Sequence, residues 1–245
     1  MYSLQRLALL LALGLATLPA LLAQSSSSSD TATAPVPNQA QAQGQMSVQA
    51  RIRIRREQRR AAAIHDAYAH RYEVYAGTGY LRFTPGSTLQ RLNYFPAWDA
   101  GFTRYYSERL GVTLDGRGYY GGAFIGPNYP TNTAVYKPTI STYAAMAGPT
   151  YRFYLKPKYS AAARVMAGFA YGNFSGDLSG FKPEQLGLYP DGVTYALNAS
   201  VIADYNISPT LAVRVVPEYL ATGFGSTVQN SLGFTAGIAY RFGKQ

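Results

Sequence analysis

The sequence predicts an all-β fold: an eight-stranded antiparallel up-and-down barrel that crosses a membrane. Three observations lead to this prediction. Residues 231–242 alternate strictly between apolar residues and small or polar ones, which is the period of a strand and not of a helix. Similar alternating runs recur throughout residues 72–242. The connections between these runs are short and long in turn, as in a barrel with turns on one side and loops on the other.

Eight alternating runs are predicted as strands, and each is long enough to span a bilayer when tilted. They are residues 72–83, 97–107, 110–121, 140–155, 159–171, 193–207, 211–222 and 231–242. Short connections at 108–109, 156–158 and 208–210 alternate with longer ones at 84–96, 122–139, 172–192 and 223–230. A soluble β-sandwich gives no reason for this one-sided pattern.

The alternation assigns one face of each strand to lipid and the other to the lumen. Apolar and aromatic residues such as Trp98, Leu114, Val165 and Val201 fall on the predicted lipid face. The charged residues at inward positions are Glu73, Asp99, Asp115, Arg117, Arg152, Arg164, Asp204, Arg214, Glu218 and Arg241. Eight strands leave a lumen just wide enough for side chains to fill it. Five acids and five arginines there are therefore expected to pair and to close the lumen.

Four residues interrupt the alternation. Arg82 and Arg104 fall on the lipid face near predicted strand ends. Their long side chains could reach the interface, or a β-bulge could shift the register. Pro149 and Pro217 lie inside predicted strands, where a closed barrel has no free edge for them. Local bulges are expected at both prolines.

The N-terminal part divides into three segments. Residues 1–23 have a basic start and an apolar run, which predicts a secretory signal peptide; Pro19 and the polar residues 24–29 argue against a membrane anchor. Residues 24–46 have almost no large apolar side chain and are expected to form a disordered linker. Residues 47–71 hold seven arginines and favour helix. This arm is expected to be solvated, or to bind anionic lipid or envelope polymer through the segment from Arg51 to Arg60.

Composition argues against several classes of function. The net charge is +10, but a large part of the excess lies in the short arm, so nucleic-acid binding is not expected. The absence of Cys removes thiol catalysis and Cys-based zinc sites. His65 and His70 both precede the first predicted strand, so the long loops lack the histidine of a Ser–His arrangement. We therefore predict no catalytic, cofactor or metal site and no enzyme activity.

The last strand carries a resemblance to a known family. Its ending, Thr235-x-Gly237-x-x-Tyr240-x-Phe242, resembles the C-terminal signal of bacterial outer-membrane barrels, although three residues follow it. Residues 72–242 as a whole resemble the eight-stranded outer-membrane β-barrel family that includes outer-membrane protein A and the opacity proteins. The resemblance implies location in the bacterial outer membrane and recognition of this ending by the barrel assembly machinery.

These expectations combine into one predicted function. The chain is expected to be an integral outer-membrane barrel with outer-membrane lipid around it, a plugged lumen and a structural or surface-exposed role. A narrow porin is the main alternative; a membrane-embedded enzyme and a soluble eight-stranded carrier are two others.

Overall fold

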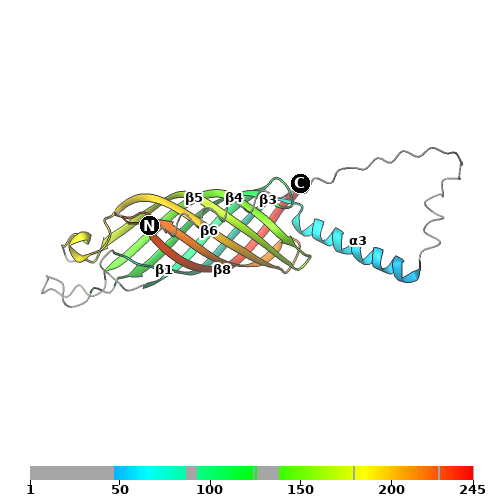
Figure 1. Ribbon diagram of the computed structural model, residues 1–245, viewed down its shortest axis with the longest axis horizontal. Helices are drawn as coiled ribbons and strands as arrows, with labels where there is room; N and C mark the ends of the chain where they lie inside the picture. Colours follow the sequence, from blue (N-terminus) through cyan, green and yellow to red (C-terminus); the bar gives the residue numbers. More distant parts are fainter. Residues whose placement is uncertain are drawn as a thin grey trace, which may run out of the picture. The chain divides into compact units, whose positions relative to one another are not determined.

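The computed structural model describes residues 47–86, 93–123, 125, 138–178, 180–225 and 227–244 (Figure 1). The signal peptide and linker predicted at 1–23 and 24–46 lie outside the described residues. Helix α3 (Val48–Tyr68) precedes a closed barrel of eight antiparallel strands. The predicted fold class and the predicted helix before the barrel are confirmed.

The strands lie close to the predicted ranges. They are β1 (His70–Phe83), β2 (Asn93–Tyr105), β3 (Leu110–Gly122), β4 (Thr139–Leu155), β5 (Tyr159–Gly176), β6 (Gly192–Asn206), β7 (Leu211–Thr222) and β8 (Gln229–Lys244). The largest differences are the earlier start of β2 and the later end of β5. Both arise because strand pairing continues beyond the alternating run: Asn93 lies opposite Phe83, and Gly176 lies opposite Thr139.

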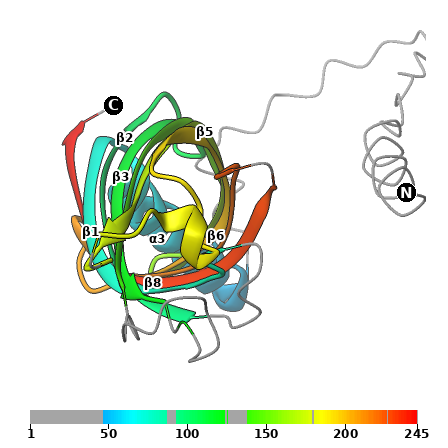
Figure 2. The ribbon, with the colours of Figure 1, turned by 90° about the vertical axis from the view of Figure 1, so that its left-hand side faces the viewer.

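Each strand pairs with its neighbours in sequence, and the pairing of β1 with β8 closes the barrel. Figure 2 looks into the lumen from the loop end, where the one-turn 3-10 helix η2 (Pro183–Leu186) lies in front of the barrel mouth. Because side chains alternate between the two faces of a strand, closure divides them into a buried set inside the barrel and an exposed set outside it.

The register is regular at both lipid-facing arginines, so of the two explanations offered for them the β-bulge is wrong. Arg82 lies opposite Tyr94 and Leu232, and Arg104 lies opposite Tyr72 and Val112, in unbroken ladders. Each arginine is the penultimate residue of its strand and is exposed. Their side chains can therefore reach the membrane interface from the strand ends.

The bulges expected at the prolines are also wrong. Pro149 lies opposite Val112, and Pro217 opposite Phe234, in regular register. On the other side of each proline the ladder skips a few pairs and resumes without a shift. Proline has no N–H to donate, so local loss of pairing is the simpler way to accommodate it. The register shifts between β4 and β5 lie instead at Thr139/Ser141 and Arg152/Tyr154.

The outer surface of the barrel has an apolar band between two groups of aromatic side chains. Exposed residues of the band include Leu114, Val165, Val201 and Ile238. The aromatic group nearer the short turns, the turn-side girdle, comprises Tyr72, Tyr106, Tyr151, Phe153, Tyr154, Tyr159, Tyr205, Tyr240 and Phe242. The group nearer the loops includes Tyr80, Tyr94, Trp98, Tyr120, Tyr143, Tyr171 and Tyr195. An apolar band between aromatic girdles is the surface of a membrane-spanning barrel.

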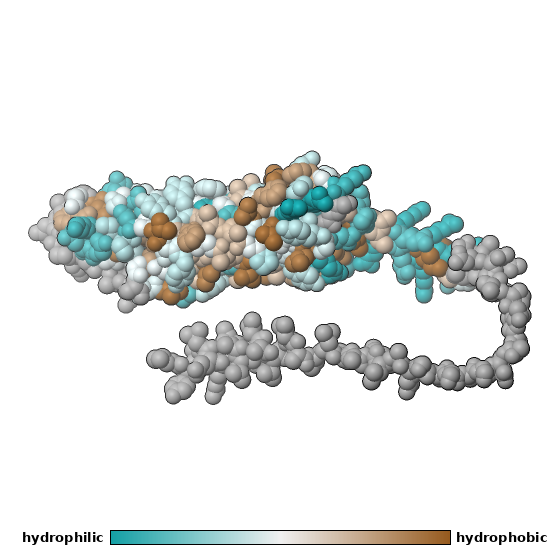
Figure 3. Space-filling view, turned by 90° about the horizontal axis from the view of Figure 1, so that it is seen from above, coloured by the Kyte–Doolittle hydropathy of each residue, from teal (hydrophilic) through white to brown (hydrophobic). Residues whose placement is uncertain are grey.

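Helix α3 has a different surface. Figure 3 shows it as mainly hydrophilic, and only Ala67 and Tyr68 at its end are buried. None of the helices in the described ranges is sufficiently long and apolar to cross a membrane. Since the helix has no broad apolar face, its contact with the barrel depends on its last residues.

Candidate functional site

The candidate site is the barrel lumen, where the structure brings together the predicted charged residues. All ten are buried, with at most 5% of their surface exposed. They separate into two groups along the lumen. The turn-side ionic cluster consists of Glu73, Arg152, Asp204, Arg214 and Arg241, and the loop-side ionic cluster of Asp99, Asp115, Arg117, Arg164 and Glu218.

The turn-side ionic cluster is one connected network. The carboxylate of Glu73 accepts hydrogen bonds from Arg152 at 2.8 Å, Arg214 at 2.7 Å and Arg241 at 3.0 Å. Asp204 accepts from Arg214 at 2.9 and 3.0 Å and from Arg241 at 2.8 Å. These contacts link β1, β4, β6, β7 and β8 across the lumen. Two carboxylates thus hold three guanidinium groups, which leaves this cluster with one excess positive charge.

The loop-side ionic cluster has the opposite imbalance. Arg117 donates to Asp115 at 2.5 Å and to Glu218, and Arg164 lies 3.6 Å from Asp115. Asp99, the third carboxylate, has no ion pair within the described residues; its nearest polar contact is the Thr235 hydroxyl at 3.4 Å. The structure therefore does not join Asp99 to the salt-bridge network in which the sequence placed it.

Hydrogen bonding is also less complete on the loop side. Seven buried side-chain atoms have no partner among the described residues: Asp99 Oδ1, Arg117 Nη2, Thr142 Oγ1, Arg164 Nη2, Asn198 Oδ1, Glu218 Oε1 and Ser231 Oγ. None belongs to the turn-side ionic cluster. A buried polar group without a partner costs about 1–3 kcal/mol. The turn-side cluster, whose polar atoms are more completely hydrogen-bonded, is therefore the more stable of the two.

Tyr75 connects the two clusters and was not among the predicted lumen residues. Its hydroxyl donates to Asp115 and accepts from Arg164 at 2.5 Å. The guanidinium groups of Arg164 and Arg214 lie 5.2 and 5.1 Å from the centre of its ring. The ring is therefore in contact with one arginine of each cluster. The available signal was its position: Tyr75 is two residues from Glu73 on the same strand face.

Tyr68, the last residue of α3, occupies the turn end of the lumen. Its hydroxyl donates to the Lys156 carbonyl at 2.9 Å and accepts from Asn206 at 2.6 Å. The guanidinium groups of Arg152 and Arg241 lie 5.2 and 5.1 Å from its ring centre. The side chain is completely buried. Tyr68 therefore attaches the arm to the barrel and covers the turn-side ionic cluster.

The loop end of the lumen is filled by apolar side chains, which the predicted ionic lumen did not include. The rings of Phe83 and Phe95 lie 5.6 Å apart and those of Phe174 and Phe224 lie 5.2 Å apart. Leu186 of η2 is completely buried in the same cluster. Alternation does place Phe83 inward, so the sequence held part of the signal for this apolar closure, whereas Phe95 lies in the predicted connection at 84–96.

The predicted C-terminal assembly residues lie on β8 with two orientations. Thr235 is buried, and Gly237 lies between Gly77 of β1 and Arg214 of β7. Tyr240 and Phe242 face outward with 50% and 37% of their surfaces exposed. Their rings stack 6.0 Å apart and belong to the turn-side girdle. In the closed barrel these two side chains are positioned for contact with lipid.

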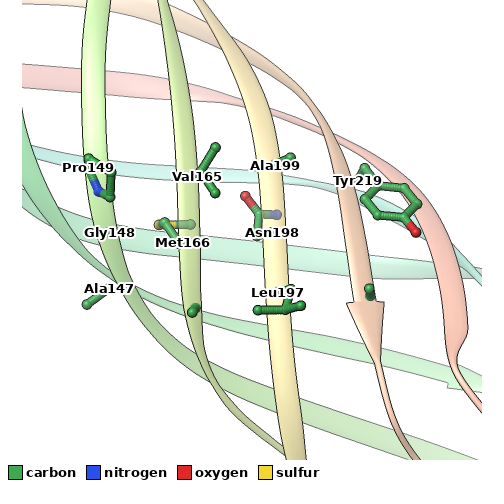
Figure 4. Close-up of a pocket in the computed structure, with 11 residues that line it drawn as sticks. Ala147, Gly148, Pro149, Val165, Met166, Leu197, Asn198, Ala199 and Tyr219 are labelled. Carbon is green, nitrogen blue, oxygen red and sulfur yellow. The ribbon is translucent and has the colours of Figure 1, made fainter. Parts of the chain in front are cut away.

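A depression of about 460 Å³ lies on the outer surface of β4 to β7 (Figure 4). Pro149, Val165, Leu197 and Tyr219 line it, together with small residues such as Gly148. Because its lining is almost entirely apolar and faces outward, it suits a hydrocarbon chain better than a polar ligand. Within the described ranges, no three His, Cys, Asp or Glu side chains are grouped so that they could hold a metal ion.

Comparisons with known proteins identify the fold. No family model matches the chain. No curated protein matches it either. Among solved structures, the outer-membrane protein OprG from Pseudomonas aeruginosa matches with a TM-score of 0.50 and 9% identity, over 72% of this chain and 98% of that one.

Two further solved structures match less well. Neisserial surface protein A has a TM-score of 0.46 and 16% identity, over 70% of this chain and 97% of that one. The third is Ail, the attachment invasion locus protein of Yersinia pestis, in complex with the heparin analogue sucrose octasulfate. It has a TM-score of 0.43 and 13% identity, over 69% of this chain and 97% of that one. The resemblance inferred from the last strand is thus confirmed at the level of the fold, which is that of an eight-stranded outer-membrane barrel.

Proposed function

We propose that this chain is an integral protein of the bacterial outer membrane, with a structural or surface-exposed role and a lumen that does not conduct. The observation that carries the proposal is that buried side chains occupy the turn end, the middle and the loop end of the lumen in the described part of the chain. Tyr68 covers its turn end, two ionic clusters cross its middle, and the apolar cluster around Phe174 fills its loop end. Such a barrel acts through its surface and loops and not through a channel.

Lipid is the first partner that the surface supports. The exposed apolar band between two aromatic girdles would be unfavourable in water, whereas a bilayer buries the band and hydrates the girdles. The eight strands form a closed sheet, which removes the edges that hydrocarbon cannot solvate. These features favour a membrane barrel over a soluble carrier.

The arrangement of the lumen also favours a plug over a porin or an enzyme. Glu73 of β1 contacts Arg152 of β4, and Arg117 of β3 contacts Glu218 of β7, so ion pairs cross the bore. Of the two histidines, His65 contacts Glu108 at the turn end, away from the loops. An enzyme reaction therefore has no observation in its favour.

Single-channel recording in planar bilayers tests the plugged lumen. The refolded protein is expected to show no stable openings. Openings in the wild type that change in Arg214→Ala or Asp115→Ala would support the narrow porin. Fractionation provides the second test: the proposal requires detergent for release from the outer membrane, and release into buffer alone would support the soluble carrier.

The orientation and the remaining partners are part of the same proposal. The short turns and α3 would face the periplasm, residues 1–23 would direct export, and residues 24–46 would form a linker. The barrel assembly machinery would recognise β8 through Thr235, Gly237, Tyr240 and Phe242. Proteolysis of intact cells should cut within residues 122–139 and 172–192 and leave 47–71 intact. Cleavage of the arm on intact cells would reverse the proposed topology.

The basic arm is proposed to bind an anionic envelope polymer or anionic lipid. Six arginines between Arg51 and Arg60 are exposed, and none forms an ion pair with another described residue. Like charges lie three and four positions apart, as at Arg51 and Arg55, which destabilises an isolated helix. An anionic partner would relieve this repulsion. Binding of the full-length protein to purified cell-wall sacculi, compared with a variant in which the six arginines are glutamine, tests this role.

A further inference from the structure

The net charge of the protein is concentrated at one end of the barrel. The five acids and five arginines of the lumen balance. At the loop end, the described residues hold two basic side chains, Arg82 and Lys182, against three acids, Asp177, Glu184 and Asp191. The turn end together with α3 holds twelve basic residues against Glu57, Asp66 and Glu108. Nearly all of the excess positive charge thus lies at the turn end.

Half of these twelve basic residues belong to the barrel itself. They form what we term the turn-side basic ring: Arg71, Arg104, Arg109, Lys156, Lys158 and Lys244. They come from the ends of β1, β2 and β8 and from the β2–β3 and β4–β5 turns. Five of the six are exposed, and Lys156 is half-buried. The ring therefore extends around much of the barrel circumference.

The ring lies at the depth of the turn-side girdle. The guanidinium of Arg104 lies 5.3 Å from the ring centre of Tyr106, and Lys156 Nζ lies 5.0 Å from that of Tyr154. Exposed tyrosines in such girdles lie at the level of lipid headgroups. The cations in contact with them are therefore placed where phosphate groups occur.

In the part of the chain that the structure describes, these cations have no acidic partner. No member of the ring has an ion pair among the described residues. Glu108, the acidic residue of the β2–β3 turn, is 2.6 Å from His65 of α3. The guanidinium of Arg109 makes one polar contact among the described residues, with the Phe153 carbonyl at 3.4 Å. The ring is thus available to external anions.

We propose that the turn-side basic ring binds the headgroups of anionic phospholipids in the leaflet around the turn end, and selects them over zwitterionic ones. This inference rests on the proposed membrane location. Basic residues next to a membrane surface are attracted to anionic lipid, and arginine forms paired hydrogen bonds with phosphate. A ring at headgroup depth fits a lipid leaflet, whereas an extended polymer would contact one side of the barrel.

The experiment uses the full chain refolded into phosphatidylcholine vesicles that contain a minor fraction of phosphatidylglycerol. Electron paramagnetic resonance of spin-labelled phosphatidylglycerol and spin-labelled phosphatidylcholine gives the relative association of each lipid with the barrel. The wild type is expected to prefer phosphatidylglycerol by a factor on the order of five at low salt. High salt should reduce the preference because the ring is exposed.

Three variants locate the site. The triple variant Arg104→Gln, Lys156→Gln, Lys158→Gln should lose most of the preference. Arg82→Gln, which removes a lipid-facing arginine near the opposite end, should retain it. Glutamine at all six arginines between Arg51 and Arg60 should also retain it. An unchanged preference in the triple variant, or a loss confined to the arm variant, would overturn the proposal.

Insertion of each variant is checked separately by the shift in gel mobility between unboiled and boiled samples. A variant that inserts normally but shows no lipid preference bears on the ring alone. Failure of the wild type to insert would instead contradict the proposed function. The two failures are therefore distinguishable.

Discussion

Glu73 has three arginine partners from three different strands, and no other described lumen carboxylate has as many. Because this carboxylate is only 1% exposed, its negative charge is compensated by these arginines and not by water, and it compensates their positive charges in turn. Removal of one member of a buried ionic network leaves the others without compensation, which is more harmful than the loss of a surface pair.

Glu73→Gln should therefore reduce the free energy of unfolding by about 3–5 kcal/mol, because Arg152 would lose its carboxylate partner and Asp204 alone would compensate Arg214 and Arg241. Urea titration of the refolded barrel in vesicles measures the change. Glu108→Gln removes an exposed partner of His65 and should change stability by less than about 1 kcal/mol. Equal effects of the two substitutions would show that the turn-side ionic cluster is not stabilising.

Tyr75 supplies a second test at the residue scale. Tyr75→Phe keeps the ring beneath Arg164 and Arg214 but removes the hydroxyl between Asp115 and Arg164. The expected loss is about 1–3 kcal/mol of unfolding free energy, since the polar groups left behind are buried. Tyr106→Phe, at an exposed tyrosine, is the control and should be nearly neutral. A neutral Tyr75→Phe would indicate that Arg164 and Asp115 pair adequately by themselves.

Among the elements, α3 contacts the barrel through the exposed pair of His65 and Glu108 and through Tyr68, which is the buried side chain of the junction. Tyr68→Ala would remove two hydrogen bonds and the ring that Arg152 and Arg241 contact. We expect a loss of about 2–4 kcal/mol and lower backbone order parameters throughout α3 by NMR relaxation. Tyr106→Ala, which truncates an exposed tyrosine, should leave both unchanged. Unaltered order parameters in Tyr68→Ala would place the attachment of the arm elsewhere.

Strand β8 has two proposed roles, contact with lipid and recognition during assembly. Phe242→Ala should lower outer-membrane levels in cells much more than it lowers the stability of the barrel refolded in vesicles. Leu232→Ala, on the same exposed face but outside the terminal motif, separates the roles. Immunoblots of outer-membrane fractions measure the levels. Normal levels of Phe242→Ala would remove the assembly role and leave the strand intact.

At the scale of the whole molecule, closure of the sheet is the property that resists detergent. Eight strands paired in a ring have no edge from which unfolding can begin. The unboiled protein should therefore migrate in a detergent gel at a different position from the boiled protein. Identical mobility before and after boiling would contradict a closed barrel.

Much of the fold was predictable because its signal is local. Alternation with period two assigned Val165 to lipid and its neighbour Arg164 to the lumen without knowledge of any partner strand. Turn lengths indicated the up-and-down order. The effect of Pro149 and Pro217 on strand pairing was not predictable. Whether a proline causes a β-bulge or a local loss of pairing depends on the neighbouring strands.

By itself, the sequence determined which side chains enter the lumen and that their charges balance, since both follow from alternation and composition. Only the tertiary structure decided the partners. Arg152 and Glu73 are 79 positions apart, and Arg117 and Glu218 are 101 apart, so strand closure and register set their meeting. The same closure separated the ten balanced charges into two clusters of opposite net charge and left Asp99 outside the ion pairs. It also brought Tyr68 into the turn end of the lumen. The physical reason is that the face of a strand is a local property, whereas contact across a lumen depends on the relative positions of all eight strands.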